Sequence, residues 1–319
     1  MALGLLLPSD AGRTFTPHAP PVRVDLRPAE LFEPTNGAAS VPLAHLEERL
    51  FELPPPGEWP LHLIGSSDDL SAARDLLLPK GWTPSETVVD DVQATASSIR
   101  EGDNATPAAS PYRPNSFLSA ALSEVELEGA DEPGVAIDLG CGSGRDAVFM
   151  SEELATRTNW DVIGLDNHAA ALERARALAR RVALQQQSSL AQRVPRSPPR
   201  LSFEAVDLRK GGLEATLEAR PSQPLRLVHG CRWLDLKLLA SLPTLLAPGG
   251  LLMWSTFLDP PSGEPLAPPY RRSRRLSSGQ MRQILGEASG MEVLYDGEGE
   301  LLTRSTWCTA QFYCARRVE

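Results

Sequence analysis

The chain has 319 residues, of which 42% are hydrophobic and 23% charged. This is the composition of an ordinary soluble globular protein with one or two domains. Non-specific binding of nucleic acid requires a broad positive field, and a chain with a net charge of −10 does not provide one, so a nucleic-acid partner is disfavoured. No apolar run approaches the roughly 18 residues of a membrane span. The four cysteines lack the spacing of a disulfide framework or zinc site, so we expect a cytoplasmic protein with reduced thiols and no metal.

The first break in the chain is a small, polar, proline-containing stretch at 95–114, which has neither helical nor strand periodicity. It predicts a first domain at 1–100, a linker at 101–114 and a second domain at 115–319. Two further stretches, 185–200 and 259–276, have loop composition and are predicted as long loops inside the second domain.

Beyond the linker, short apolar runs alternate with helical patterns. Strands are predicted at 135–139, 161–165, 201–206, 225–230 and 251–257, and helices at 147–154, 169–184, 236–246 and 278–289. Two closing strands, 291–295 and 309–314, have no helical pattern between them and are expected to pair antiparallel at an edge. The prediction is an α/β fold with a doubly wound, mostly parallel, seven-stranded sheet.

The most informative segment is AIDLGCGSGRDAVFM at 136–150, in which a buried strand meets a helix through Gly140, Gly142 and Gly144. Glycines there permit a tight turn and let a ligand approach the backbone at the carboxyl edge of the sheet. A dinucleotide fingerprint would need glycine where Arg145 stands, and a phosphate-binding P-loop would need a Gly-Lys-Ser/Thr sequence that is absent.

The ordered motifs of residues 112–317 resemble class I S-adenosylmethionine-dependent methyltransferases, and LLAPGGLLMWSTF at 245–257 resembles the turn and fifth strand of that family. The resemblance implies a Rossmann-like methyltransferase fold and S-adenosylmethionine as cofactor. It implies that the glycine turn faces the methionine and ribose, that an acidic residue after the second strand binds the ribose hydroxyls, and that one after the third strand contacts the adenine. The implied cofactor-binding residues are Asp138, Gly140, Cys141, Gly142, Gly144, Asp166, Asn167, Asp207 and Leu208.

Each acidic candidate has a structural alternative. A carboxylate accepts two charge-assisted hydrogen bonds from a ribose diol, but Asp166 is also placed to cap the following helix. Asp207 follows a strand, where aspartate often forms a turn. Asp138 is alternatively a buried carboxylate bound to backbone N–H groups.

Within that family, GSGRDAVFM resembles the tellurite-resistance and thiopurine-type branch, whose substrates are small molecules. That branch implies a histidine after the fourth strand. This chain has the sequence Arg-Trp-Leu-Asp at 232–235 instead, so the family's mechanism does not transfer to the acceptor.

Methyl transfer is an in-line displacement in which the protein supplies position and electrostatics. Arg232 and Asp235 are the catalytic candidates, with a surface salt pair or a helix cap as their alternative. The candidates for substrate binding are Trp233, Tyr270 and Arg271. His229 is predicted to be a packed strand residue, and Phe117 and Leu118 either cover the site or belong to the core.

Residues 22–88 resemble rhodanese-like domains, with Asp25 and Arg27 in the position of that family's Asp-x-Arg motif. The loop that would hold the sulfur-carrying cysteine reads Gly-Ser-Ser-Asp-Asp at 65–69, and the first cysteine of the chain is Cys141. Sulfur transfer needs a thiolate, so this domain is predicted to be a degenerate one with a structural or docking role.

The combined prediction is an enzyme that transfers a methyl group from S-adenosylmethionine to a small-molecule acceptor, with a possible protein partner at the N-terminal domain and no membrane attachment. Two alternatives stay open. One is a tRNA or protein methyltransferase that docks its substrate through the N-terminal domain. The other is a non-catalytic cofactor-binding subunit of a partner enzyme.

Overall fold

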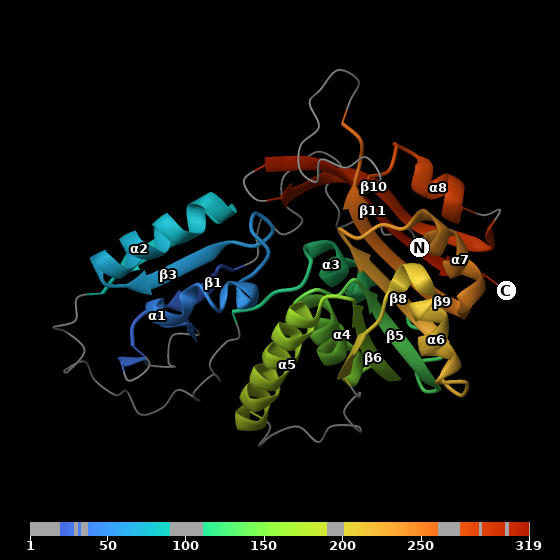
Figure 1. Cartoon of the computed structure of the whole chain (residues 1–319), viewed down its shortest axis with the longest axis horizontal. Helices are drawn as coiled ribbons and strands as arrows, with labels where there is room; N and C mark the ends of the chain where they lie inside the picture. Colours follow the sequence, from blue (N-terminus) through green and yellow to red (C-terminus); the bar gives the residue numbers. More distant parts are fainter. Residues whose placement is uncertain are drawn as a thin grey trace.

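The computed structural model describes residues 20–28, 31–32, 38–89, 111–189, 201–260, 275–286, 289–303 and 306–318. They form two α/β units, each built on its own sheet (Figure 1). We call residues 20–89 the N-terminal unit and residues 111–318 the large unit. None of the described helices combines the length and apolar character needed to cross a bilayer.

The N-terminal unit contains a small parallel sheet with the strand order β2-β1-β3-β4. Its strands are β1 (Val22–Asp25), β2 (Ala39–Ser40), β3 (Leu61–Gly65) and β4 (Ser85–Val88). Its α-helices are α1 (Leu43–Leu46) and α2 (Ser67–Leu77). Leu26, Leu46, Leu63 and Leu70 are fully buried, so this unit has a hydrophobic core of its own.

The large unit contains a seven-stranded sheet with the order β10-β11-β9-β8-β5-β6-β7. The strands are β5 (Pro133–Leu139), β6 (Asn159–Asp166), β7 (Leu201–Ala205), β8 (Leu225–Cys231), β9 (Leu246–Phe257), β10 (Met291–Thr303) and β11 (Thr306–Arg317). Strands β5 to β9 pair parallel, while β11 pairs antiparallel with both β9 and β10. The predicted mostly parallel sheet with an antiparallel edge is confirmed.

Helices cover both faces of this sheet (Figure 1). They are α3 (Ser116–Glu124), α4 (Arg145–Ala155), α5 (Ala169–Ser189), α6 (Gly212–Glu218), α7 (Leu236–Leu245) and α8 (Gln280–Leu285). The predicted closing strands, 291–295 and 309–314, were too short, because β10 and β11 continue pairing as far as Thr303 and Thr306. The sequence pattern also gave no sign of α6.

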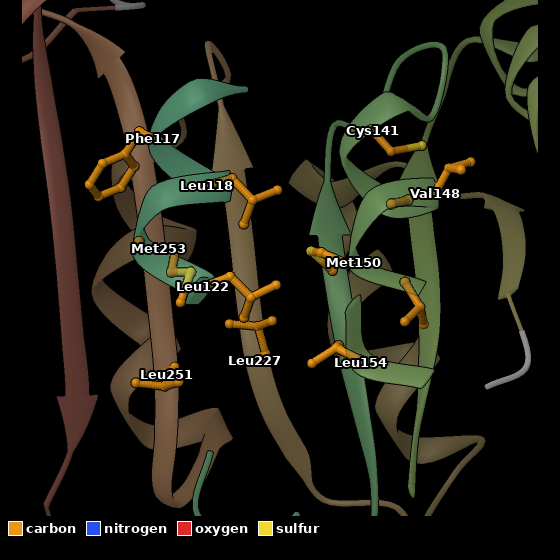
Figure 2. Close-up of a cluster of buried hydrophobic side chains, with 14 of the residues drawn as sticks. Phe117, Leu118, Leu122, Cys141, Val148, Met150, Leu154, Leu227, Leu251 and Met253 are labelled. Carbon is orange, nitrogen blue, oxygen red and sulfur yellow. The ribbon is translucent and has the colours of Figure 1, made fainter. Parts of the chain in front are cut away.

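Alternation along each strand divides the core between the two faces of the sheet. On β9, Leu251 and Met253 pack in one cluster with α3 and α4, while Leu252 and Trp254 pack in the other with α7 and α8. Figure 2 shows the first cluster, in which side chains of α3 lie over strands β8 and β9, and side chains of α4 lie over strands β5 and β6. Phe117 and Leu118 therefore belong to the core rather than to a cover over the site.

Phe117 gives a direct test of this packing. Its ring is fully buried and lies 5.5 Å from the ring of Phe312 and 5.8 Å from that of Tyr295. Phe117→Ala is expected to lower the free energy of unfolding by about 3–5 kcal/mol, because it leaves a cavity between α3 and the sheet. Urea denaturation checks this. Leu236→Ala at a side chain that is 42% exposed is the control and is expected to cost less than about 1 kcal/mol.

Candidate functional site

The turn between β5 and α4 is the most tightly constrained piece of backbone in the large unit. Gly140, Gly142 and Gly144 all have positive φ, at 69°, 53° and 78°. A Cβ on Gly140 would lie 2.9 Å from the ring of Trp233, and one on Gly144 would lie 2.6 Å from the Cβ of Ala175. A Cβ on Gly142 would meet nothing within 4 Å. The turn is therefore closed on both sides and open at Gly142.

Asp166 ends β6 beside this opening. Its Oδ2 accepts a hydrogen bond from the N–H of Gly142 at 2.9 Å, and its Oδ1 accepts one from the N–H of His168 at 2.8 Å. The second bond closes a turn just before α5, whose first turn is capped by His168, since the N–H of Ala171 donates to His168 Nδ1 at 3.2 Å. The capping role that the sequence left as an alternative for Asp166 is therefore filled by His168. The first bond places the carboxylate against the open glycine, where a ligand diol could reach it. Asn167, which follows Asp166 in the sequence, is exposed.

Asp207 lies at the same edge of the sheet, because it follows the neighbouring strand β7. Its Oδ1 accepts a hydrogen bond from the N–H of Arg209 at 3.1 Å, and its carboxylate lies 3.3 Å from Lys210 Nζ. The turn-forming role is therefore present. Leu208 is buried beside it.

Asp138 is the buried member of the acidic set, with 2% of its surface exposed. Its Oδ2 has no hydrogen-bond partner within the described part of the chain. Burial raises the pKa of Asp138 to about 7; the carboxylates of Asp146 and Asp166 add to this increase, and His229 opposes it. A buried carboxylate oxygen without a partner is costly, so a group that binds it, such as a ligand, an ion or a water molecule, would lower the free energy of the site.

His229 and Asp146 form a buried pair next to Asp138. His229 is fully buried on β8 in register with Asp138, and its Nε2 lies 3.1 Å from Asp146 Oδ2. Burial opposes charge on both groups, but their mutual hydrogen bond and attraction outweigh it, so the pKa of His229 is raised and that of Asp146 is lowered. The predicted packed role of His229 is confirmed. Asp146 also accepts the N–H of Asn115 at 2.6 Å.

Arg232, a catalytic candidate, is held in an ion pair. It follows β8 and is the one non-glycine residue with positive φ among those described, at 58°. Its Nη2 donates to Oε1 of Glu58 at 2.8 Å. Glu58 belongs to the N-terminal unit, and its Oε2 accepts from the backbone N–H of Ser116 at 3.0 Å and from Asn115 Nδ2 at 3.2 Å.

The other acceptor-side candidates have structural partners or lie outside the described residues. Asp235 caps α7, because its Oδ1 accepts from the N–H groups of Lys237 and Leu238. Trp233 packs against Gly140, and its ring centroid lies 6.1 Å from that of Trp254. Tyr270 and Arg271 lie outside the described residues.

Two cysteines near the turn are not placed to act as thiolates. Burial raises the pKa of Cys141 far above its ordinary value, and the carboxylates of Asp138 and Asp166 add to the increase. Burial also raises the pKa of Cys231 to about 12. Both thiols therefore stay protonated at neutral pH.

Sequence reasoning missed Glu58 and Asp146. Glu58 is an isolated acid in a proline-rich turn, 174 positions before its partner Arg232. Asp146 has the ordinary appearance of an acid in the first turn of a helix, where it complements the dipole. Only the folded arrangement shows that each forms a buried charge pair.

The arrangement can now be compared with known proteins. Residues 131–258 match the family model described as "Methyltransferase domain". This part of the chain is therefore similar to methyltransferase domains. The matched segment contains the glycine turn, Asp166, Asp207 and the strand that carries His229.

Solved structures with a similar backbone include TehB from Haemophilus influenzae, with 14% identity and a TM-score of 0.42 over 63% of this chain and 61% of TehB. An S-adenosylmethionine-dependent methyltransferase from Methanosarcina mazei has 16% identity and a TM-score of 0.39 over 59% of this chain and 94% of its own. An arsenic(III) S-adenosylmethionine methyltransferase from Chlamydomonas reinhardtii has 19% identity and a TM-score of 0.40 over 64% and 73%. The match thus spans less than two thirds of TehB. No curated protein sequence matches the chain.

The glycine turn between β5 and α4 yields a matched pair of variants. Gly144→Ala combines a positive φ with a clash against Ala175, so it is expected to lower the free energy of unfolding by about 3 kcal/mol or more. Gly142→Ala has the positive φ without the clash and is expected to cost about 1 kcal/mol. Urea denaturation measures both. Equal losses would contradict the described packing of the turn.

Asp138 predicts a pH dependence of stability. The folded state holds its proton up to about pH 7, whereas an unfolded aspartate releases it near pH 4, so the stability it contributes falls as the pH rises between these values. Each pH unit in this window changes the free energy of unfolding by at most about 1.4 kcal/mol. The difference in free energy of unfolding between Asp138→Asn and the natural protein is therefore expected to shift in favour of the variant when the pH is raised from 4.5 to 7.5. Urea titrations at both pH values test this, and a constant difference would contradict it.

Proposed function

We propose that the methyltransferase domain transfers a methyl group from S-adenosylmethionine to a small-molecule acceptor. The observation that carries the proposal is the open Gly142, with the Asp166 carboxylate against it, together with Asp138 at the end of β5, whose Oδ2 has no hydrogen-bond partner among the described residues. These are the features that a ligand with a diol and an ammonium group would occupy. We assign the ribose to Asp166 and Asn167, the adenine to Asp207 and Leu208, and the methionine end to Asp138 and the turn containing Gly140, Cys141, Gly142 and Gly144.

When bound, the cofactor supplies an activated methyl group on a positively charged sulfur. The residues of the chain bind and orient the reactants. His229 is fully buried and bonded to Asp146, so it is not placed to remove a proton from an acceptor. Asp235 is engaged as a helix cap. This favours an acceptor that needs little help from a base, such as a thiol or another soft nucleophile.

For the N-terminal unit we propose a degenerate rhodanese-like domain without sulfurtransferase activity. The loop that would hold the sulfur-carrying cysteine follows β3 and leads into the amino end of α2. Side chains of this loop and of the first turn of α2 already occupy that helix end. Ser66 Oγ accepts from the N–H of Asp69 at 3.2 Å and donates to Asp69 Oδ2 at 2.8 Å. A carboxylate at this place would repel a persulfide. For the large unit we propose that it belongs to the tellurite-resistance and thiopurine-type branch of methyltransferases.

The test of cofactor binding uses Asp166. Asp166→Ala is expected to weaken the binding of S-adenosylmethionine at least about 100-fold, because two charge-assisted hydrogen bonds are lost. Isothermal titration calorimetry on the full chain measures this. The matched control is Asp235→Ala, which removes a helix-capping aspartate from the same edge of the sheet; it should cost similar stability, about 1 kcal/mol, without loss of binding. Unchanged affinity in Asp166→Ala would contradict the assignment.

Incubation with labelled S-adenosylmethionine and fractionated cell extract then identifies the acceptor class. Label in a small-molecule fraction supports the proposal, whereas label in tRNA or protein favours the docking alternative. A chain that binds the cofactor but labels no fraction would be a non-catalytic partner subunit.

A further inference from the structure

One turn of the N-terminal unit, residues 53–59, lies against the methyltransferase domain. The backbone oxygen of Leu53 accepts from Arg145 Nη1 at 2.8 Å, and the indole N–H of Trp59 donates to the oxygen of Pro114 at 2.9 Å. A Cβ on Gly57 would lie 2.8 Å from the ring of Trp307, on the long β10–β11 hairpin. These contacts reach α4, the entry to α3 and the edge of the sheet, so the turn is fixed at several points.

Glu58 is the charged residue of this turn and is 5% exposed. Its Oε1 pairs with Arg232, while its Oε2 accepts from Asn115 and Ser116. Both oxygens are therefore engaged by donors of the large unit. A buried carboxylate so completely bound cannot leave its place without exposing an unpaired arginine.

Two arginines stand together beside the glycine turn. Arg145 directly follows Gly144, and Arg232 directly follows β8, next to the Trp233 ring that covers Gly140. Both guanidinium groups bind the same turn of the N-terminal unit, Arg145 through the backbone oxygen of Leu53 and Arg232 through the carboxylate of Glu58. Burial lowers the pKa of Arg145, and the charge of Arg232 acts in the same direction. The carboxylates of Asp146 and Glu58 act in the opposite direction.

This charge balance matters for a cationic ligand. The cofactor of a methyltransferase carries its reactive methyl group on a positive sulfur, and two uncompensated arginines would disfavour it by Coulomb repulsion. Asp146 already accepts a hydrogen bond from the N–H of Asn115 and is paired with the His229 ring, so it is engaged within the large unit. Glu58 is then the main counter-charge for Arg232.

We propose that Glu58, supplied by the N-terminal unit, is a positioning residue of the cofactor site: it fixes Arg232 and cancels its charge, so that the glycine turn accepts a positively charged sulfonium ligand. The inference rests on the proposed function. It makes the N-terminal unit an electrostatic part of the methyltransferase site, in addition to any docking role.

The test compares two ligands that differ by one methyl group and its charge. S-Adenosylmethionine carries the positive sulfur, and S-adenosylhomocysteine carries a neutral one. Calorimetry on the full chain at pH 7.5 gives the ratio of their affinities. In Glu58→Gln, which keeps the shape and an accepting oxygen, the ratio is expected to shift about three- to tenfold against S-adenosylmethionine. Glu48→Gln, at an exposed glutamate of the same unit, is the matched control and is expected to leave the ratio unchanged.

Arg232→Gln gives the opposite sign. It leaves Glu58 without its partner cation, so the ratio is expected to shift toward S-adenosylmethionine, and the double variant is expected to return near the natural ratio. A purely structural contact would weaken both ligands equally and could not reverse the sign. Parallel losses for both ligands in either single variant would overturn the inference while the proposed function stands. Failure of the natural protein to bind either ligand would overturn both.

Discussion

The burial of charge at the centre of the large sheet is the constraint on which the rest of this structure depends. His229 lies fully buried on β8, and its presence there requires a partner. Asp146 can serve only because the glycine turn brings the first residues of α4 back over the end of β8. The three positive φ values of that turn are therefore needed for packing as well as for leaving space at Gly142.

The same constraint extends into the N-terminal unit. Asp146 also binds the N–H of Asn115, whose side chain caps α3 by accepting the N–H of Leu118 at 3.1 Å. Glu58 takes the remaining donors at that helix end and the guanidinium of Arg232. A chain of polar contacts therefore runs from His229 on β8 through Asp146 and Asn115 to Glu58 in the turn at 53–59. Removing one member of such a network can cost more than the pairwise contacts suggest.

The sequence predicts those parts of the fold whose cause is local. Strand and helix periodicity places the five parallel strands, and the spacing of glycines and acids places Gly142 and Asp166 at one edge. Strand β10 is only partly predicted, because Gly297 and Gly299 have the pattern of a loop; pairing with β11 extends it to Thr303. The partner of Arg232 could not be predicted, since an isolated glutamate acquires its meaning only from a contact 174 positions away.

The two sides of the glycine turn thus have opposite characters. On the side of β6 and β7, Asp166 and Asp207 bind only nearby groups of the large unit, and the backbone at Gly142 is open. On the side of β8, the Trp233 ring covers the turn at Gly140, and the neighbouring Arg232 is paired with Glu58. The carboxylates on the open side attract positive charge, and Arg174, which donates to Ser143 Oγ in the turn, and Lys210, which pairs with Asp207, offset part of this attraction. On the side of β8, the N-terminal unit contributes the carboxylate of Glu58, which balances the charge of Arg232.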